Sequence, residues 1–314
     1  MRTHTNVFRR RLLAACLLVI TIATWGTPVA ESADGRRRRG DYPDVNIVRD
    51  LVYKHVDGRD LQLDIYSPKS VSHPLPVVFW IHGNRWSRGG KNHGPPLNLM
   101  AEGYIVVTLD YRLSGEAPFP AAIEDCKAAV RWLRAHAATY HIDLDHIGAW
   151  GHSAGGHLAA LLGTTGGVAD LEGAGDNSNF SSRVQAVCTM AGPSDIVQFY
   201  QTVANSNEEM PRIAKSSIEQ FLGGPIEKTR AKAIAASPTT YASKDDAPFL
   251  IIHGENDKSI PVEQAEILAQ KLKEGGVDTT LDIEKGRGHG VGGPAFSSEI
   301  IDFFNKHLKG GKSR

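Results

Sequence analysis

The sequence predicts an α/β protein with a mostly parallel central sheet and helices on both faces. Several runs are too rich in apolar residues for strands with one exposed face, and strands buried on both faces of a parallel sheet have this composition. These runs are residues 75–81, 104–109, 147–150, 184–190 and 248–252. Segments with helical spacing of apolar residues lie between them, at 121–137 and 262–274. Strands therefore alternate with helices.

Residues 1–33 have the layout of a secretory signal peptide. Arginines at 2 and 9–11 precede an apolar run at 12–22, which Thr-, Gly- and Pro-containing sequence follows. The run is about half of the roughly 20 residues that a membrane-spanning helix needs. We therefore expect cleavage and export to the periplasm or the medium, with no stable membrane association afterwards. The alternatives are an uncleaved anchor and, because of Cys16, a lipoprotein.

Residues 34–44 are predicted to be a basic linker, with consecutive arginines at 36–39. No aromatic residues or helical pattern accompany the run, so we interpret it as solvated chain rather than as a segment that binds a wall polymer or nucleic acid. The whole sequence has 35 Lys and Arg against 35 Asp and Glu. Because no net charge attracts a polyanion, nucleic acid is not expected as a partner.

One domain is predicted over residues 45–310. It opens with two strand-like runs within 45–66, around the dipeptide Asp57-Gly58, which favours a hairpin turn. A polar segment with helical character at 194–236 is interpreted as a small lid insertion above the sheet.

The two clearest helices carry terminal signals. Glu124 and Asp125 fall in the first turn of the helix at 121–137, where acidic side chains favour the positive dipole end. The helix at 262–274 follows Pro261 and stops at Gly275. A further strand is predicted at 279–283.

After removal of the leader, the remaining cysteines are Cys126 and Cys188. One falls in a predicted helix and the other in a predicted strand, and we expect both to be small buried hydrophobic residues. A single bridge between them is the alternative. Neither has neighbours that suggest a metal cluster, so no metal site is expected there.

The strongest motif is Gly151-His152-Ser153-Ala154-Gly155, between a buried strand and a helix rich in small residues. A serine on such a turn has a strained backbone, and its hydroxyl projects above the sheet as a nucleophile. The Ala154 amide begins the helix and is suited to hold an oxyanion. His152 is adjacent to the serine, and we assign it a packing role because neighbours on a tight turn point apart.

A serine nucleophile needs a histidine base and a carboxylate that orients the histidine. Asp257 lies on a turn after the strand at 248–252, and His289 lies in a glycine-flanked loop after the strand at 279–283. The order Ser153, Asp257, His289 is the order of the α/β-hydrolase fold. Glu255 and Asp195 compete with Asp257 for the acid role, and His253 and His307 compete with His289 for the base.

Five motifs together resemble the hormone-sensitive-lipase-like esterases, and in particular the bifunctional feruloyl and acetyl-xylan esterase group. They are His82-Gly83-Asn84-Arg85-Trp86, Asp110-Tyr111-Arg112-Leu113, the segments 119–125 and 129–133, and Gly151-His152-Ser153-Ala154-Gly155-Gly156. The resemblance covers residues 52–307. It implies hydrolysis of carboxylic esters without a metal or organic cofactor, on a small-molecule or carbohydrate ester.

The loop that starts at His82 departs from this family, which usually has His-Gly-Gly-Gly or His-Gly-Gly followed by an aromatic residue. Here the third and fourth places are Asn84 and Arg85. The backbone amides of Gly83 and Asn84 remain available as the second part of an oxyanion hole. Side chains now crowd the loop, which puts the size of the acyl group in doubt. Arg85 is interpreted as a solvated residue or as a contact to a substrate carboxylate or sugar hydroxyl. Trp86 stacks on substrate or packs under the loop, and His82 shapes the loop.

The sequence therefore predicts an exported serine carboxylesterase with Ser153 as nucleophile, His289 as base and Asp257 as orienting acid. A serine peptidase of the prolyl-oligopeptidase type is the alternative among enzymes, because its hydrolase half has similar Asp and His segments. A non-catalytic binding protein with this fold is the alternative from another class. Such proteins usually lack a member of the triad, whereas this sequence retains all three.

Overall fold

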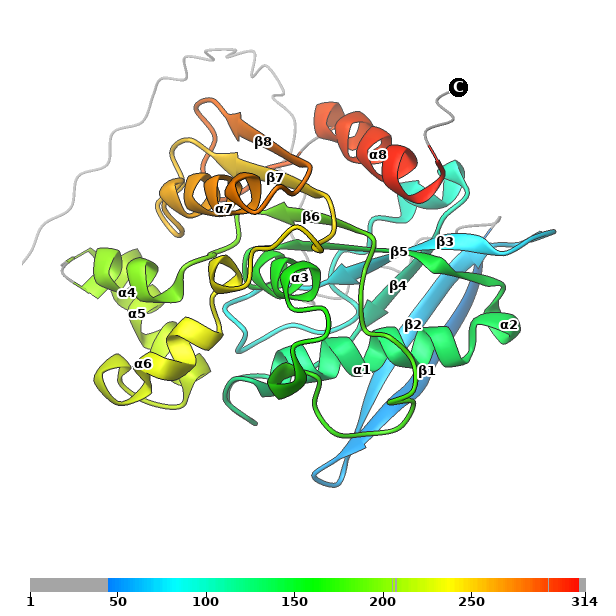
Figure 1. Cartoon of the computed structure of the whole chain (residues 1–314), viewed down its shortest axis with the longest axis horizontal. Coiled ribbons are helices and arrows are strands. Elements are labelled where there is room, and N and C mark those ends of the chain that lie inside the picture. Colours follow the sequence, from blue (N-terminus) through cyan, green and yellow to red (C-terminus); the bar gives the residue numbers. More distant parts are fainter. Residues whose placement is uncertain (1–44, 205, 207, 293, 311–314) are drawn as a thin grey trace, which may run out of the picture. The chain divides into compact units, whose positions relative to one another are not determined.

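The computed structural model describes residues 45–204, 206, 208–292 and 294–310, and the predicted signal peptide and linker lie outside them. These residues form an eight-stranded sheet in the order β1-β2-β4-β3-β5-β6-β7-β8 (Figure 1). The strands are β1 Val45–Val56, β2 Arg59–Pro68, β3 Leu75–Ile81, β4 Ile105–Leu109, β5 Ile142–His152, β6 Ala186–Met190, β7 Phe249–Gly254 and β8 Thr279–Glu284. Only the pairings of β2 with β1 and with β4 are antiparallel.

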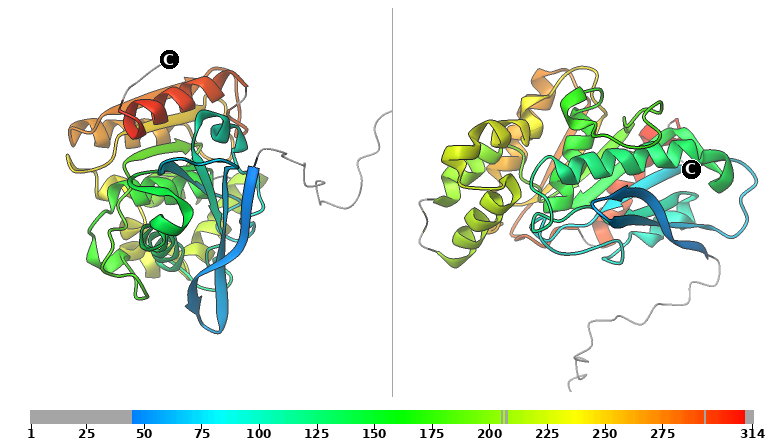
Figure 2. Two further views of the ribbon diagram at one scale, coloured as in Figure 1. Left: turned by 90° about the vertical axis from the view of Figure 1, so that its right-hand side faces the viewer. Right: turned by 90° about the horizontal axis from the view of Figure 1, so that it is seen from below.

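Both faces of the sheet are covered by helices. Alternate strand residues pack against α1 (Ala121–Ala135), α3 (Ala154–Thr164) and α7 (Glu263–Glu274) in one core. The residues between them pack against η1 (Leu97–Glu102) and α8 (Pro294–Leu308) in a second core, and α8 lies across the sheet from α1 and α3 (Figure 2). The dense apolar runs are thus explained by burial on both faces, and the predicted fold class is confirmed.

The remaining helices include three within the segment at 194–236. They are α4 (Ile196–Ala204), α5 (Glu209–Leu222) and α6 (Ile226–Ala235), and Figure 1 shows them together at one end of the sheet. The short elements α2 (Ala137–Tyr140), η2 (Ala169–Leu171) and η3 (Pro238–Thr240) complete the chain. Interpretation of 194–236 as a lid stays a prediction.

Helix α1 is shorter than the helix that the sequence predicts at 121–137. It ends at Ala135 because His136 leaves the helical conformation, with φ −107° and ψ 15°. The backbone N–H and the ring Nδ1 of His136 both lie within hydrogen-bond distance of the Trp132 carbonyl oxygen, at 3.1 and 2.8 Å. The His136 ring also stacks on the Trp132 ring. Histidine side chains near a helix C-terminus can bond the last carbonyl groups in this way.

Asp125 differs from its expected role as a first-turn acid. It is fully buried and accepts two hydrogen bonds from the Arg112 guanidinium, from Nε at 2.8 Å and from Nη2 at 2.9 Å. Lys54 of β1 donates to the same carboxylate at 2.6 Å. Asp125 therefore ties the β1–β2 hairpin to α1, and a buried carboxylate of this kind depends on its partners.

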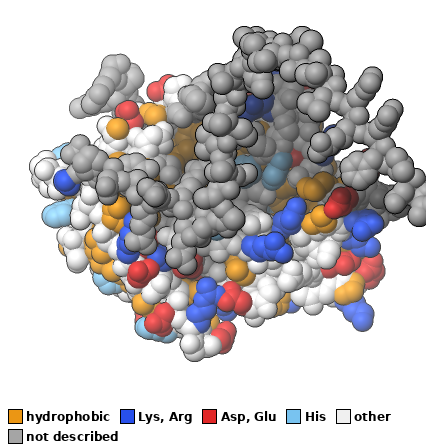
Figure 3. Space-filling view, turned by 180° about the vertical axis from the view of Figure 1, so that it is seen from behind, with side chains coloured by type: hydrophobic (Ala, Val, Ile, Leu, Met, Phe, Trp, Pro, Cys, Tyr) orange, Lys and Arg blue, Asp and Glu red, His pale blue; other side chains and the backbone are white. Residues whose placement is uncertain are grey.

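The structure also bears on the predictions about the cysteines, membrane association and surface charge. Cys126 and Cys188 are buried and unpaired, in the two separate cores. Among the described residues, no helix is long and apolar enough to span a membrane. On the face drawn in Figure 3, basic and acidic side chains are interspersed over the lower part of the described surface.

Candidate active site

Ser153 lies on a sharp turn between β5 and α3, with φ 58° and ψ −124°. This φ is in the left-handed region, which non-glycine residues rarely adopt. Two glycines make the turn possible. A Cβ atom on Gly155 would lie 2.0 Å from the carbonyl oxygen of Ile81, and one on Gly151 would lie 2.3 Å from the carbonyl carbon of Gly155. The N–H of Ser153 donates to the carbonyl of Met190 at 2.8 Å, which fixes the turn against β6.

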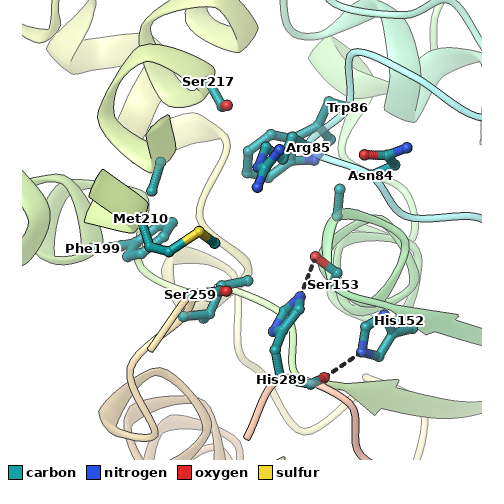
Figure 4. Close-up of a pocket in the computed structure, with 13 residues that line it drawn as sticks. Asn84, Arg85, Trp86, His152, Ser153, Phe199, Met210, Ser217, Ser259 and His289 are labelled. Atoms are coloured by element: carbon teal, nitrogen blue, oxygen red, sulfur yellow. Dashed lines mark hydrogen bonds between the residues drawn. The ribbon is translucent and has the colours of Figure 1, made fainter. Parts of the chain in front are cut away.

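The structure brings Ser153, His289 and Asp257 together. The Ser153 Oγ lies 3.0 Å from Nε2 of His289 (Figure 4). On the other side of the ring, Nδ1 of His289 lies 2.7 Å from Oδ2 of Asp257. A carboxylate accepts hydrogen bonds, so Nδ1 carries the proton of the neutral ring. Nε2 is then the acceptor for the serine hydroxyl. The three side chains come from the ends of β5, β7 and β8, as the order of the motifs predicts.

The carboxylate of Asp257 is buried and fully engaged. Its Oδ1 accepts from the backbone N–H groups of Ser259 and Ile260, at 2.8 and 3.0 Å. Burial alone would raise the pKa of Asp257, but hydrogen bonds from His253, His289 and the Ile260 backbone outweigh it and hold the pKa well below its usual value. Asp257 is therefore ionised at neutral pH and opposes any charge that forms on His289.

The competing acids lie elsewhere. Glu255 accepts from the N–H of Gly286 at 2.8 Å, and Asp195 accepts from the N–H of Gln198 at the start of α4, at 2.9 Å. Both carboxylates therefore support the local backbone, and neither contacts His289.

The competing bases also have other partners. His253 is buried, and its Nε2 donates to the carbonyl of Ile260 at 2.9 Å while lying 3.4 Å from Oδ2 of Asp257. His307 of α8 lies 3.7 Å from a carboxylate oxygen of Asp278. His253 thus holds the acid turn, and the structure brings neither histidine to Ser153.

The loop after β3 lies against the serine turn. A Cβ atom on Gly83 would lie 2.6 Å from the carbonyl oxygen of His152 and 3.3 Å from Cβ of Ser153. Among the described residues, no hydrogen bond uses the amides of Gly83 and Asn84. The amide of Ala154 is in the first turn of α3, where N–H groups lack helical partners. The three predicted donors are thus available beside Ser153.

The same loop holds three consecutive non-glycine residues in the left-handed region. The φ angles are 79° at Asn84, 59° at Arg85 and 57° at Trp86. Each such residue costs about 1–2 kcal/mol relative to the right-handed conformation. The strain is maintained by contacts on both sides of the loop.

Aromatic side chains fix the two ends of this loop. His82 is buried and stacks on Tyr111 at 4.3 Å between ring centroids, and the Tyr111 hydroxyl donates to the His82 carbonyl at 3.0 Å. Burial lowers the pKa of His82 to about 4. Trp86 is 3% exposed, stacks on Phe221 of α5 at 4.4 Å, and donates from Nε1 to Nδ1 of His157 at 3.1 Å. These contacts agree with the interpretation that Trp86 packs under the loop. Stacking of Trp86 on a substrate stays a prediction.

A pocket of about 250 Å³ opens at Ser153. The loops contribute its polar wall, and α4 and α5 contribute an apolar wall (Figure 4). Its lining residues are Asn84, Arg85, Trp86, His152, Ser153, Ala154, Phe199, Met210, Ala214, Ser217, Ser259, Ile260 and His289. Within the described ranges, no group of three or more His, Cys, Asp or Glu residues is arranged to hold a metal ion.

The sequence of this chain matches the model of a known protein family. The BD-FAE family model matches residues 63–272, more than half of the chain. The chain belongs to the BD-FAE family. The resemblance inferred from the five motifs is therefore confirmed.

Relatives of this BD-FAE chain include esterases. It is 32% identical to the probable carboxylic ester hydrolase LipM of Mycobacterium tuberculosis, over 69% of this chain and 50% of that protein. It thus spans about half the length of the curated relatives that it matches. Among solved structures, it resembles a bifunctional GH43-CE protein of Bacteroides eggerthii, with a TM-score of 0.72, 33% identity, and coverage of 83% of this chain and 38% of the other. It also resembles a truncated carbohydrate esterase from gut microbiota, with a TM-score of 0.71, 28% identity, and coverage of 84% and 96%.

Two histidines of this BD-FAE chain have contacts that the sequence did not indicate. His152 does more than pack, because its Nε2 donates to the backbone carbonyl of His289 at 2.8 Å. His157 is fully buried, accepts from Trp86 on one side, and donates from Nε2 to the carbonyl of Ala236 at 2.7 Å on the other. In both cases a partner is a distant backbone carbonyl, for which a sequence has no signal.

Proposed function

We propose that this chain is a serine-dependent carboxylic ester hydrolase, with Ser153 as nucleophile, His289 as base and Asp257 as orienting acid. The observation that carries the proposal is the continuous hydrogen-bond path from the Ser153 hydroxyl through His289 to the ionised Asp257. A histidine held in this tautomer accepts the serine proton and is stabilised when it becomes charged. Esterases among the relatives support the same reaction class.

The reaction proceeds in two halves. Ser153 Oγ attacks the ester carbonyl as its proton passes to Nε2 of His289, and the amides of Gly83, Asn84 and Ala154 hold the tetrahedral oxyanion. His289 then gives the proton to the leaving alcohol, and an acyl-serine remains. Water attacks this acyl group while His289 takes its proton, and collapse of the second intermediate returns the proton to Ser153 and releases the acid.

The pocket favours esters with a short acyl group. Its volume of about 250 Å³ is below the roughly 300–1,000 Å³ that is usual for drug-sized ligands. The side chains of Asn84 and Arg85 occupy part of the wall beside Ser153. The carbohydrate esterase among the structural relatives supports an acylated carbohydrate as the substrate.

We assign a lid role to the segment at 194–236, because Phe199 of α4 and Met210, Ala214 and Ser217 of α5 line the pocket. For residues 1–33 we propose a cleaved export signal. Mass spectrometry of the N-terminus of protein recovered from the periplasm or the medium tests that assignment. An intact Met1 in a cytoplasmic product would contradict it.

Covalent labelling tests the nucleophile. A fluorophosphonate probe should label the wild-type protein, whereas Ser153→Ala should lose both labelling and hydrolysis of p-nitrophenyl acetate. Ser217→Ala is a matched control, because Ser217 also lines the pocket but contacts no base within the described chain, and it should still be labelled. Equal labelling of Ser153→Ala and wild type would reject the assignment.

The same assay addresses the alternatives. Hydrolysis of p-nitrophenyl acetate without cleavage of a proline anilide is expected of an esterase, whereas cleavage of the proline anilide is expected of a peptidase. The relatives described above lend the peptidase no support. A non-catalytic binding protein would cleave neither substrate.

A further inference from the structure

Arg85 is a cation at the pocket, and none of its described neighbours neutralises its charge. Its side chain is exposed, lines the pocket, and has no hydrogen bond or ion pair within the part of the chain that the structure describes. Figure 4 shows the guanidinium on the pocket side of the loop, facing Met210 and Ser217 of α5. The group is therefore free to bind a molecule that occupies the pocket.

The other lining residues do not balance this charge. None of them is a Lys, an Asp or a Glu, so Arg85 contributes the one fixed formal charge among the described residues of the lining. The nearest catalytic carboxylate, Asp257, is already bonded to His289 and to the amides of Ser259 and Ile260. An anion that enters the pocket thus meets a positive charge, with no carboxylate among the described lining residues to compete for it.

The backbone at Arg85 is strained. Arg85 has a φ of 59°, between Asn84 at 79° and Trp86 at 57°. Glycine adopts this conformation without steric cost. An arginine retains the strain and adds a long cationic side chain directly beside the oxyanion amides. Strained residues of this kind cluster at active sites and ligand-binding sites.

We propose that Arg85 recognises a carboxylate on the substrate, so that the preferred substrates are esters that carry a negative charge near the scissile bond. This inference rests on the proposed ester hydrolysis. A guanidinium binds a carboxylate through two parallel N–H groups, which gives orientation as well as attraction. The carboxylate belongs either to the acyl group, as in a monoester of a dicarboxylic acid, or to the alcohol, as in an acetylated uronic acid.

Two pairs of substrates test the proposal and separate the two sources. The acyl pair is monomethyl succinate and methyl butyrate, and the alcohol pair is an acetylated methyl glucuronoside and the corresponding methyl glucoside. Released acid is followed by pH-stat titration. In the wild type, kcat/KM should favour the charged member of at least one pair by about tenfold or more, as expected for a hydrogen-bonded charge. The pair that shows the preference identifies the side of the ester that carries the carboxylate.

Variants assign the preference to Arg85. Arg85→Gln should reduce the ratio of kcat/KM for charged and neutral members to about one, and Arg85→Lys should retain part of it, because a lysine keeps the charge but loses the paired N–H groups. Arg88→Gln is the matched control, since Arg88 is an exposed arginine of the same loop that does not line the pocket. It should keep the wild-type ratio. Increasing salt should lower the wild-type ratio and leave that of Arg85→Gln unchanged.

The outcomes are distinct. No preference in either pair, or an unchanged ratio in Arg85→Gln, overturns the role of Arg85 while hydrolysis of the neutral esters still supports the esterase. Loss of the ratio in Arg88→Gln as well would mean that the effect comes from net charge and would also overturn it. If wild type hydrolyses no ester of either pair and p-nitrophenyl acetate is also stable, the proposed function itself fails.

Discussion

The ring of His152 donates a hydrogen bond of 2.8 Å from Nε2 to the backbone carbonyl of His289. His152 is the last residue of β5, directly before Ser153, so the strand that carries the proposed nucleophile also holds the loop that carries the proposed base. The centroids of the His152 and His289 rings lie 4.9 Å apart. Burial lowers the pKa of His152, which keeps the ring uncharged beside its partner. We therefore expect His152 to act as a positioning residue for His289.

Replacement of this donor should loosen the base. His152→Phe keeps an aromatic ring but leaves the His289 carbonyl without its partner, and we expect kcat to fall about tenfold, because small displacements of catalytic groups are costly. KM should change little, since the contact is to the base and not to substrate. His152→Gln retains an N–H donor and should recover most of kcat. Steady-state kinetics with p-nitrophenyl acetate give kcat and KM for each variant. Equal kcat in His152→Phe and His152→Gln would rule out the positioning role.

Asp257 should be the acid on which the base depends. Asp257→Asn retains the shape of the side chain but removes the charge and favours the wrong tautomer of His289, so kcat should fall by about 10³–10⁴. The control is Glu255→Gln, which keeps an oxygen acceptor for the N–H of Gly286 and should leave kcat within about twofold. Rates of p-nitrophenyl acetate hydrolysis and of fluorophosphonate labelling should both show the difference. A larger loss in Glu255→Gln than in Asp257→Asn would exchange their roles.

Gly83 should be essential to the oxyanion hole. An added Cβ would lie 2.6 Å from the His152 carbonyl oxygen, which is backbone and does not give way easily. Gly83→Ala should therefore push the loop from Ser153 and lower kcat by about 10²–10³, the usual effect of a lost oxyanion donor. Gly115→Ala is the matched control, because its Cβ would meet only the end of the Gln220 side chain, at 3.6 Å. Wild-type kcat in Gly83→Ala would show that the loop is not part of the hole.

Much of the fold and of the site follows from local patterns. The dense apolar runs predicted the parallel strands because burial on both faces leaves no polar positions. The Ser153 turn was predicted because its backbone conformation requires small neighbours, and these leave a recognisable motif. His289 and Asp257 were predicted because the carboxyl ends of parallel strands share one edge, so that loops distant in sequence meet there.

Two kinds of contact could not be predicted from the sequence. They are hydrogen bonds to distant backbone carbonyls and the packing of one element's side chains against another element. His152 and His289 are 137 positions apart and meet through a carbonyl that every residue possesses. An amphipathic pattern indicates that α5 buries one face, but not that Met210 and Ser217 meet the pocket. The contact of the His136 ring with the last turn of α1 was not predicted either. The ion pair of Asp125 with Lys54 joins α1 to a hairpin far away in sequence.

His157 should make stability depend on pH. It is neutral in the folded protein, since Nε2 donates to the Ala236 carbonyl while Nδ1 accepts from Trp86, and burial lowers its pKa from 6.5 to about 4. The unfolded chain therefore binds more protons between these values, and stability that is fully present above pH 6.5 is lost as the pH falls towards 4, by up to about 1.4 kcal/mol per pH unit.

Urea unfolding at pH 7, 6, 5 and 4.5 measures this contribution of His157. His157→Gln preserves an acceptor and a donor but does not titrate, so its unfolding free energy should fall with a shallower slope than that of the wild type between pH 6 and 4.5. His73→Gln, which alters an exposed histidine, should keep the wild-type slope, because it leaves the contacts of His157 with Trp86 and Ala236 intact. If His157→Gln and wild type lose stability in parallel, protonation of His157 is not what weakens the contact between the Trp86 loop and the end of α6.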